Sequence, residues 1–164
     1  MSDPIPVCDY EGSDYRARFW QNQGRDYEDG AERVALRRLM PPSGGALLDV
    51  GAGFGRLAGE YDGYRRVVLF DYSRSLLREA RDRWGDDPRF LFVAGNWYNL
   101  PFADGVFDTL VQVRTLHHAA DAPALFAELA RVARVDAAYV LEFASKHNLK
   151  AMLRYRLGRQ AWSP

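Results

Sequence analysis

The chain has 164 residues, of which 48% are hydrophobic and 27% are charged, and its 22 basic side chains balance 22 acidic ones. This length and composition predict one globular domain, and the formal net charge of zero gives no general argument for a nucleic-acid or membrane-surface partner. The single cysteine, Cys8, excludes an intrachain disulfide and a zinc site built on paired cysteines.

The amino-terminal stretch MSDPIPV lacks the basic region and the long apolar region of a signal peptide. No apolar run approaches the roughly 18 residues that a membrane span needs. We therefore expect a cytoplasmic protein without a membrane partner.

The first 24 residues are polar, and we interpret them as an irregular arm or short helix that carries four aromatic side chains: Tyr10, Tyr15, Phe19 and Trp20. Beyond this arm, helical and strand patterns alternate. Apolar spacing predicts helices over Asp26–Met40, Arg56–Tyr61, Ser73–Trp84, Ala122–Val135 and Ser145–Leu157, with Ser73 as an N-cap. Short apolar runs predict strands over Ala46–Val50, Val67–Phe70, Phe90–Ala94, Phe107–Val113 and Ala138–Phe143.

Most of these strands are near-continuous apolar runs, which is typical of a parallel sheet covered by helices on both faces. The predicted fold is therefore α/β, a doubly wound, mainly parallel, Rossmann-like sheet. Ligands of such sheets bind outside the carboxyl ends of the strands, which places the first glycine loop, Asp71, Asn96 and Arg114 at one rim. We divide the single domain, 1–164, into the arm, a core over 25–145 and a basic helix over 146–164.

The stretch LLDVGAGFGR carries three glycines two residues apart, Gly51, Gly53 and Gly55, directly after the first strand. Glycines allow unusual dihedral angles and let a ligand approach the backbone closely, and the following segment offers the positive N-terminus of a helix. Dinucleotide-binding loops need a small residue where this chain has Arg56, which argues against a nicotinamide dehydrogenase. The alternative interpretation is a tight strand-to-helix turn.

Asp71 ends the second strand, 22 positions after Asp49, close to the roughly 20-residue offset of a ribose-binding acid. A carboxylate there can accept charge-assisted hydrogen bonds from both ribose hydroxyls, whereas without the glycine loop it would be a polar strand end. Asn96 follows the third strand and offers an amide that can pair with an adenine edge. Trp97 would stack on a ligand or fill the core, and core filling is favoured when this residue is considered alone.

Together these segments resemble the class I S-adenosylmethionine-dependent methyltransferases, and most closely the small-molecule branch (type 11) that includes ubiquinone/menaquinone C-methyltransferase-like enzymes. The resemblance covers roughly residues 25–145 and follows the order and spacing of the family. It rests on LDVGAGFG (Leu48–Gly55), FDYS (Phe70–Ser73), GNWYNLPF (Gly95–Phe102), FDTLV (Phe107–Val111) and LHH (Leu116–His118). It implies an enzyme that transfers a methyl group from S-adenosylmethionine to a small organic acceptor.

The resemblance implies how the adenosine part of the cofactor is bound. Asp71 would bind the ribose hydroxyls, and Tyr72 would lie against the adenine. Asn96 and the backbone of Trp97 would meet the adenine edge. Asn96 stands where the family often has aspartate, so the amide keeps an acceptor but loses the charge.

The resemblance also implies how the methionine part is bound. The loop Gly51–Gly55 would hold it, with Asp49 near its amino group. In the stretch GRDYE, Arg25 or Tyr27 would contact the carboxylate, and the alternative is a capped start of the first helix.

Near the reacting sulfonium, the resemblance places the backbone of Val113 and Arg114. No catalytic residue is assigned, because methyl transfer depends mainly on position and requires no metal. If the acceptor must lose a proton, His117 and His118 are the candidates, although a structural pair at a strand-to-helix turn is favoured over this role.

The family sheet usually has seven strands, whereas this sequence stops at Pro164 without the last antiparallel hairpin. The chain is then a fragment or a shortened version of the fold. The fifth strand would lie at an open sheet edge, which invites pairing with another chain, so we expect a homodimer through this edge or a final helix folded over it. The alternative function is a cofactor-binding module without catalysis.

The end of the chain, Ser145–Pro164, carries five basic side chains and no acidic one. This segment would suit a phosphate-bearing or nucleic-acid partner. Because the chain as a whole is neutral, a solvated face of the last helix is the favoured interpretation.

Overall fold

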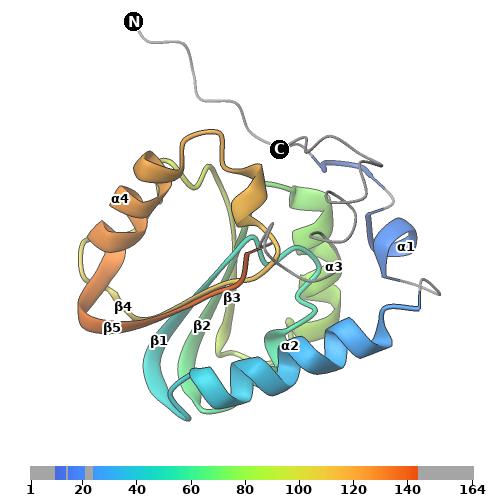
Figure 1. Ribbon diagram of the computed structural model, residues 1–164, viewed down its shortest axis with the longest axis horizontal. Helices are drawn as coiled ribbons and strands as arrows, with labels where there is room; N and C mark the ends of the chain where they lie inside the picture. Colours follow the sequence, from blue (N-terminus) through green and yellow to red (C-terminus); the bar gives the residue numbers. More distant parts are fainter. Residues whose placement is uncertain (1–9, 14, 21–23, 144–164) are drawn as a thin grey trace, which may run out of the picture.

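A computed structural model describes residues 10–13, 15–20 and 24–143, and one sheet of five parallel strands lies at its centre (Figure 1). The spatial order of the strands is β3-β2-β1-β4-β5, so the chain starts in the middle of the sheet and winds outward to both edges. This order confirms the predicted doubly wound α/β fold. The strands are β1 (Gly44–Val50), β2 (Tyr64–Asp71), β3 (Phe90–Ala94), β4 (Phe107–Gln112) and β5 (Ala133–Leu141).

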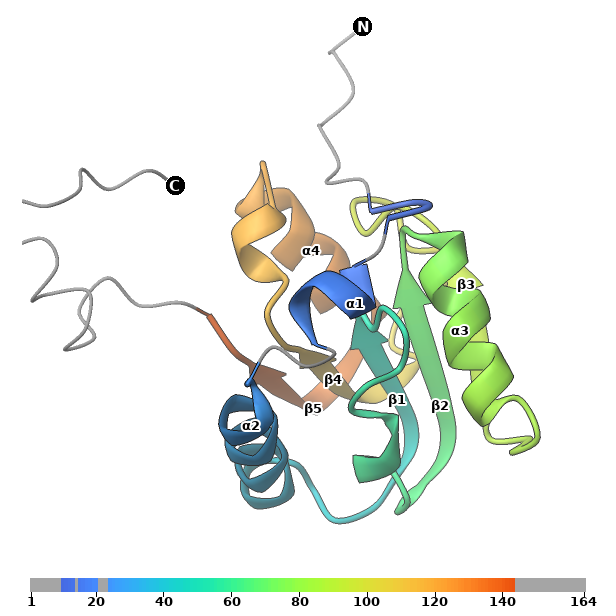
Figure 2. The ribbon, with the colours of Figure 1, turned by 90° about the vertical axis from the view of Figure 1, so that its right-hand side faces the viewer.

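Helices cover both faces of this sheet, with α2 and α3 on one face and α4 on the other (Figures 1 and 2). Successive side chains of β1 point to opposite faces, so Leu47 joins the core under α2 and α3 while Leu48 joins the core under α4. The helical elements are α1 (Tyr15–Phe19), α2 (Asp26–Leu39), α3 (Arg74–Trp84), α4 (Ala122–Val132) and the 3₁₀ turns η1 (Ala58–Glu60) and η2 (Leu116–His118).

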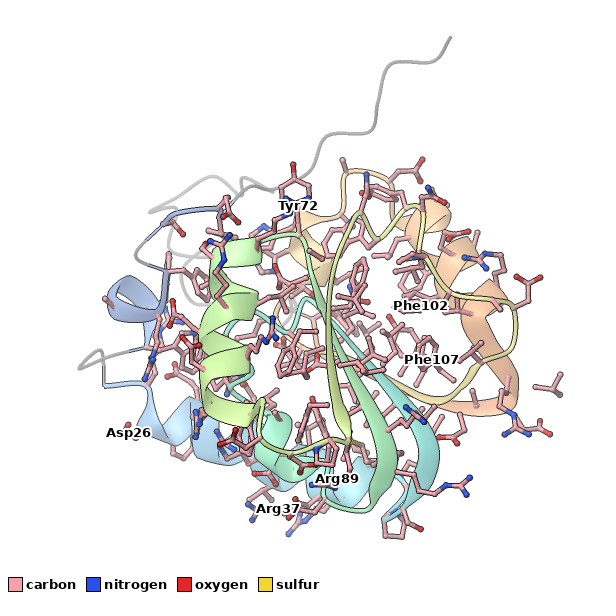
Figure 3. All side chains as sticks on the ribbon, turned by 180° about the vertical axis from the view of Figure 1, so that it is seen from behind. Asp26, Arg37, Tyr72, Arg89, Phe102 and Phe107 are labelled. Atoms are coloured by element: carbon pink, nitrogen blue, oxygen red, sulfur yellow. The ribbon has the colours of Figure 1, made fainter. Side chains whose placement is uncertain are left out.

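Aromatic side chains pack among the leucines and valines of the core under α4. Phe102 and Phe107 lie between the sheet and this helix (Figure 3), with their ring centroids 5.0 Å apart in an edge-to-face arrangement. Phe102 belongs to the segment after β3, so this packing holds the chain between β3 and β4 against the sheet although that segment contains no helix.

Both helices that follow the rim loops begin at a side-chain cap. The hydroxyl of Ser73 accepts a hydrogen bond from the Leu76 amide (3.3 Å), which confirms the predicted N-cap of α3. Asp121 caps α4 in the same way, accepting from the Ala124 amide at 2.9 Å. These caps fix the points where the chain leaves the carboxyl-end rim of the sheet.

Two predicted helices differ from the structure. The segment predicted as a helix over Arg56–Tyr61 forms only the single turn η1, because Gly55 has a left-handed φ of 69° and Gly59 adds backbone freedom within so short a segment. The helix predicted to end at Val135 ends at Val132, and β5 begins at Ala133 rather than at Ala138. The reason is that Ala133 pairs with Phe107 at the start of β4, which draws the chain into the sheet early.

The predicted helix Ser145–Leu157 lies outside the described residues, as do the first nine residues. Within the part of the chain that the structure describes, no helix is both long enough and apolar enough to cross a membrane.

Candidate functional site

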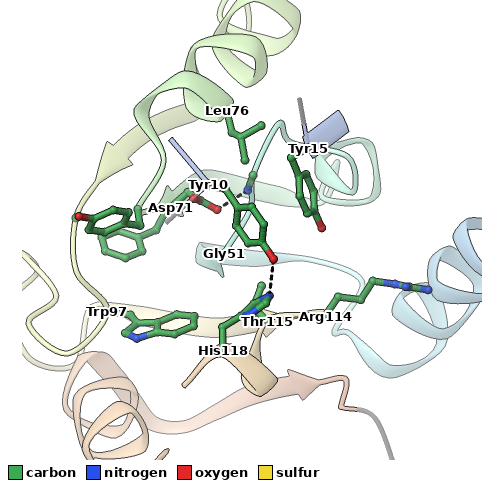
Figure 4. A pocket seen from close by; sticks show the side chains of 13 residues that line it. Tyr10, Tyr15, Gly51, Asp71, Leu76, Trp97, Arg114, Thr115 and His118 are labelled. Atoms are coloured by element: carbon green, nitrogen blue, oxygen red, sulfur yellow. Dashed lines mark hydrogen bonds between the residues drawn. The ribbon is translucent and has the colours of Figure 1, made fainter. Parts of the chain in front are cut away.

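A cleft opens at the carboxyl ends of β1, β2 and β4 (Figure 4), where the fold predicts a ligand. We call it the main cleft, and it brings together these predicted site residues: Gly51, Gly53, Asp71, Tyr72, Trp97, Arg114 and His118. An adjoining inner hollow shares the glycine loop and adds Asp49 and Val113. These two spaces therefore contain most of the positions that the sequence singled out.

The glycine loop owes its shape to left-handed backbone conformations at Gly51, Gly53 and Gly55. Gly51 has a φ of +81°, and a Cβ atom built on it would lie only 2.3 Å from Cγ2 of Thr115. Gly53 has a φ of +54°, but the nearest atom to its would-be Cβ is Cδ1 of Leu76 at 3.9 Å. Glycine at 51 is thus required by packing inside the protein, whereas glycine at 53 leaves space that opens onto the main cleft.

Asp71 joins the end of β2 to this loop. Its Oδ2 accepts a hydrogen bond from the Gly53 amide at 2.7 Å, and its Oδ1 accepts from the Ser73 amide at 2.8 Å. Burial raises the pKa of Asp71 above its usual range, and these backbone donors oppose the shift. Each carboxylate oxygen keeps a second lone pair, so Asp71 can still accept hydrogen bonds from a ligand.

Asp49 lies deeper, with only 4% of its surface exposed. The hydroxyl of Tyr61 donates a hydrogen bond to its Oδ2 at 2.8 Å. Burial raises the pKa of Asp49 to about 7, with a further contribution from Asp71, although Tyr61 and Arg56 act in the opposite direction. The inner hollow therefore holds a carboxyl group that titrates near neutrality and that a cationic ligand group would ionise.

The amino-terminal arm crosses the mouth of the main cleft. On one side, Glu11 accepts hydrogen bonds from the Ser75 amide (3.1 Å) and the Ser73 hydroxyl (3.2 Å) at the start of α3. On the other side, the Tyr10 hydroxyl lies 3.3 Å from Nε2 of His118 (Figure 4). The arm thus spans the two walls of the cleft, as expected for a segment that packs its aromatic side chains.

The two histidines lie at the turn η2, with ring centroids 3.8 Å apart. Burial lowers the pKa of His118, and the neighbouring His117 adds to this effect. Arg25 lines a third hollow together with both histidines and Arg114. This arrangement places Arg25, the residue that precedes α2, at the same hollow as the imidazole pair.

Three predicted site residues do not line any of these three spaces. Tyr27 is 86% exposed on α2. Gly55 packs under α3, where an added Cβ would lie 3.2 Å from Ala80. Asn96 uses its Oδ1 to accept a hydrogen bond from the Tyr98 amide at 2.9 Å, so it closes a local turn in the structure.

The sequence did not identify several residues that shape the site. Thr115 sets the packing against Gly51 and donates from its hydroxyl to the Val50 carbonyl at 3.3 Å. Phe70 and Leu76 also line the main cleft, whereas the sequence places them only in a strand and a helix, with Phe70 also in the FDYS stretch. No local pattern distinguishes them, because their role depends on which elements the sheet places side by side. Among the described residues, no cluster of His, Cys, Asp and Glu side chains is arranged to hold a metal ion.

The sequence signature of the methyltransferase domain matches residues 48–141 of the chain. The chain is 38% identical over 117 residues to a demethylmenaquinone methyltransferase of Roseiflexus sp. (strain RS-1), covering 70% of this chain and 48% of that protein. It is 35% identical over 94 residues to a malonyl-[acyl-carrier protein] O-methyltransferase of Geobacter sulfurreducens, covering 55% of this chain and 35% of that protein. The chain thus spans about half the length, or less, of these curated relatives.

Solved structures agree with these sequence matches. An S-adenosylmethionine-dependent methyltransferase of Mesorhizobium loti has a TM-score of 0.56 and 30% identity, covering 63% of this chain and 49% of that one. A possible histamine N-methyltransferase of Thermotoga maritima has a TM-score of 0.63 over 78% of this chain and 57% of that one, and at 21% identity it shows the fold alone.

The chain therefore belongs to the methyltransferase-domain family of class I S-adenosylmethionine-dependent methyltransferases. The cofactor of this family is S-adenosylmethionine, and the site fits it. The open space at Gly53 leaves room for a ligand against bare backbone, and the nearby carboxyl groups of Asp71 and Asp49 can accept hydrogen bonds from the hydroxyl and ammonium groups that such a cofactor carries.

The two glycines give a matched test of the loop. We predict that Gly53→Ala lowers the free energy of unfolding by roughly 1–2 kcal/mol, the cost of a left-handed conformation in an alanine. Gly51→Ala should cost at least about 1 kcal/mol more, because its Cβ would also overlap Thr115. Urea unfolding of both variants measures the difference, and equal losses would contradict the packing at Gly51.

Asp49 gives a test by pH. Because its pKa is raised in the folded state to about 7, the native protein holds the proton more tightly than the unfolded chain. We predict that the unfolding free energy of the wild type, relative to Asp49→Asn, falls by up to about 4 kcal/mol between pH 4 and 7 and then stays level. Urea unfolding across this range measures it, and a difference that rises with pH would contradict the buried carboxyl.

Proposed function

We propose that the chain binds S-adenosylmethionine across the main cleft and the inner hollow and transfers its methyl group to a small organic acceptor. The observation that supports this most directly is the hydrogen bond between Gly53 and Asp71. It brings a bare backbone loop and a strand-end carboxylate to one ligand-sized space in a chain of this family.

For the adenosine part, we assign the ribose hydroxyls to Asp71 and the flanks of the adenine to Tyr72 and Trp97, all of which line the main cleft. The Asn96 carboxamide oxygen is already bonded to the Tyr98 amide. The NH₂ group of Asn96 can then donate a hydrogen bond to an acceptor nitrogen on the adenine edge.

For the methionine part, we assign the amino group to Asp49 and the backbone contacts to Gly51 and Gly53, which line the inner hollow. A positive amino group would favour the ionised form of Asp49 and lower its pKa on binding. Between the two candidates for the carboxylate, the geometry favours Arg25, because it lines a hollow beside the cleft while Tyr27 points into solvent.

The bound cofactor supplies an electrophilic methyl group on sulfur, and the chain supplies position and shelter from water. Val113 and Arg114 both line the inner hollow, and the Arg114 amide donates a hydrogen bond to the Glu142 carboxylate at 2.7 Å. The aromatic rings of Tyr10 and Tyr15 line the cleft and suit a planar or apolar acceptor.

For an acceptor that must lose a proton, His118 is the group we assign. It lines the main cleft, and burial lowers its pKa, so the neutral, proton-accepting form dominates at neutral pH. The hydroxyl of Tyr10 lies 3.3 Å from Nε2 of His118 and would orient the imidazole.

We also propose a cytoplasmic location, which the single cysteine supports.

Binding of the cofactor is tested by thermal unfolding with S-adenosylhomocysteine, S-adenosylmethionine and NAD. A ligand at 100 times its dissociation constant adds about 2.7 kcal/mol, so we predict that the midpoint rises by several degrees with the first two compounds and not with NAD. Asp71→Asn should weaken binding about 10- to 100-fold through loss of a charged acceptor, and the exposed Asp82→Asn serves as the matched control. No shift with either sulfur compound would contradict the proposal.

We further propose that two copies pair through the open edge of the sheet. Among the described strands, β5 has β4 on one side and no strand on the other, and unpaired edges favour pairing with another chain. Light scattering over a concentration series should show the apparent mass rising toward that of a dimer. A constant monomer mass up to high micromolar concentration would contradict this pairing.

A further inference from the structure

Arg56 follows the glycine loop directly, and the cofactor contacts proposed above leave it without a role. Its side chain is only 12% exposed. The guanidinium contacts Asp29 and Glu32, both of which project from α2. A large cation at this position thus ties the glycine loop to the helix beside it, where a dinucleotide-binding loop would carry a small residue.

Glu32 holds a second arginine at the same time. One of its oxygens contacts Arg56, and the other accepts a hydrogen bond from Nε of Arg114. Arg114 lies beyond the end of β4 and has a φ of 60°, a conformation that residues with side chains rarely adopt. One carboxylate therefore connects the loop after β1 with the loop after β4.

Both arginines line the inner hollow, whereas Glu32 does not. The Glu32 side chain is 12% exposed, so solvent screens its ion pairs only partly. Within the described residues, Glu32 is the only carboxylate paired with the Arg114 side chain, while Arg56 also has Asp29. Loss of the Glu32 charge would thus release Arg114 more than Arg56.

The aromatic arm docks on the same two cations. Cζ of Arg56 lies 3.9 Å from the ring centroid of Trp20, and Cζ of Arg114 lies 5.2 Å from it. A cation over the face of an indole ring is attracted to it. The two guanidinium groups that Glu32 holds in place therefore also bind the Trp20 ring.

We propose that Glu32 is a positioning residue for the cofactor site: it acts through Arg56 and Arg114 to hold the two loops that border the inner hollow. This inference rests on the proposed function, since it assumes that S-adenosylmethionine or its product occupies that hollow. Glu32 would touch neither the cofactor nor the acceptor, and its effect would appear as a loss of ligand affinity.

The test compares Glu32→Gln with Glu60→Gln. Glu60 is a matched control because, like Glu32, it forms two ion pairs, in its case to Arg33 (2.9 Å) and Arg37 (2.6 Å) of α2, yet it lines neither the main cleft nor the inner hollow. Titration calorimetry with S-adenosylhomocysteine gives the dissociation constant of each protein, and urea unfolding gives its stability. We predict that Glu32→Gln raises the dissociation constant about 5- to 30-fold, while Glu60→Gln changes it less than about twofold despite a similar loss of stability.

A double-mutant cycle with Arg114→Gln shows whether Glu32 acts through that side chain, because coupled residues give effects that do not add. We expect the dissociation constant of the double variant to be about the same as that of whichever single variant binds S-adenosylhomocysteine less tightly. If Glu32→Gln binds like the wild type, or if both glutamate variants lose the same affinity, the inference is wrong. If the wild type itself does not bind, the proposed function fails instead. Should Glu32→Gln not fold, Glu32→Asp, which keeps the charge but shortens the reach, replaces it in the same comparison.

Discussion

The site depends on one hydrogen bond, from the Gly53 amide to the Asp71 carboxylate. It crosses from the loop after β1 to the end of β2, two strands that pair in register along their length. The parallel sheet brings their carboxyl ends to the same rim, and this bond then fixes how far the glycine loop stands from the strand-end acid. The cleft exists because that distance is held by backbone and carboxylate groups rather than by bulky side chains.

The electrostatics of the site follow from this frame. Asp49 is buried and Asp71 is partly buried near the loop, and desolvation raises the pKa of each. Arg56 opposes this for Asp49, while its guanidinium is itself held by α2. The loop therefore lies between the carboxyl groups of Asp49 and Asp71 on one side and the ion pairs of Arg56 with α2 on the other. Such an arrangement can bind a ligand that carries both a cationic group and hydrogen-bond donors.

How much the sequence could predict varied with the range of the interactions involved. The predicted strand Phe90–Ala94 has the same bounds as β3, and Ser73 is the N-cap of α3 as predicted. Both predictions succeed because apolar runs and helix caps are local signals. The site residues at strand ends followed from topology. The contacts of Glu32 with Arg56 and Arg114 could not be predicted, since they join positions 24 and 82 apart along the chain. Equally, no pattern announced that Ala133 would pair with Phe107 and end α4 early.

Amide chemical shifts measured during a titration with S-adenosylhomocysteine show whether the ligand space at the rim is the cofactor site. We expect the largest changes at Gly51, Gly53, Asp71 and Trp97, whereas residues at the opposite end of the sheet, such as Arg65 and Arg89, should stay unchanged. Changes concentrated at that opposite end, or no changes at a concentration well above millimolar, would contradict this assignment of the site.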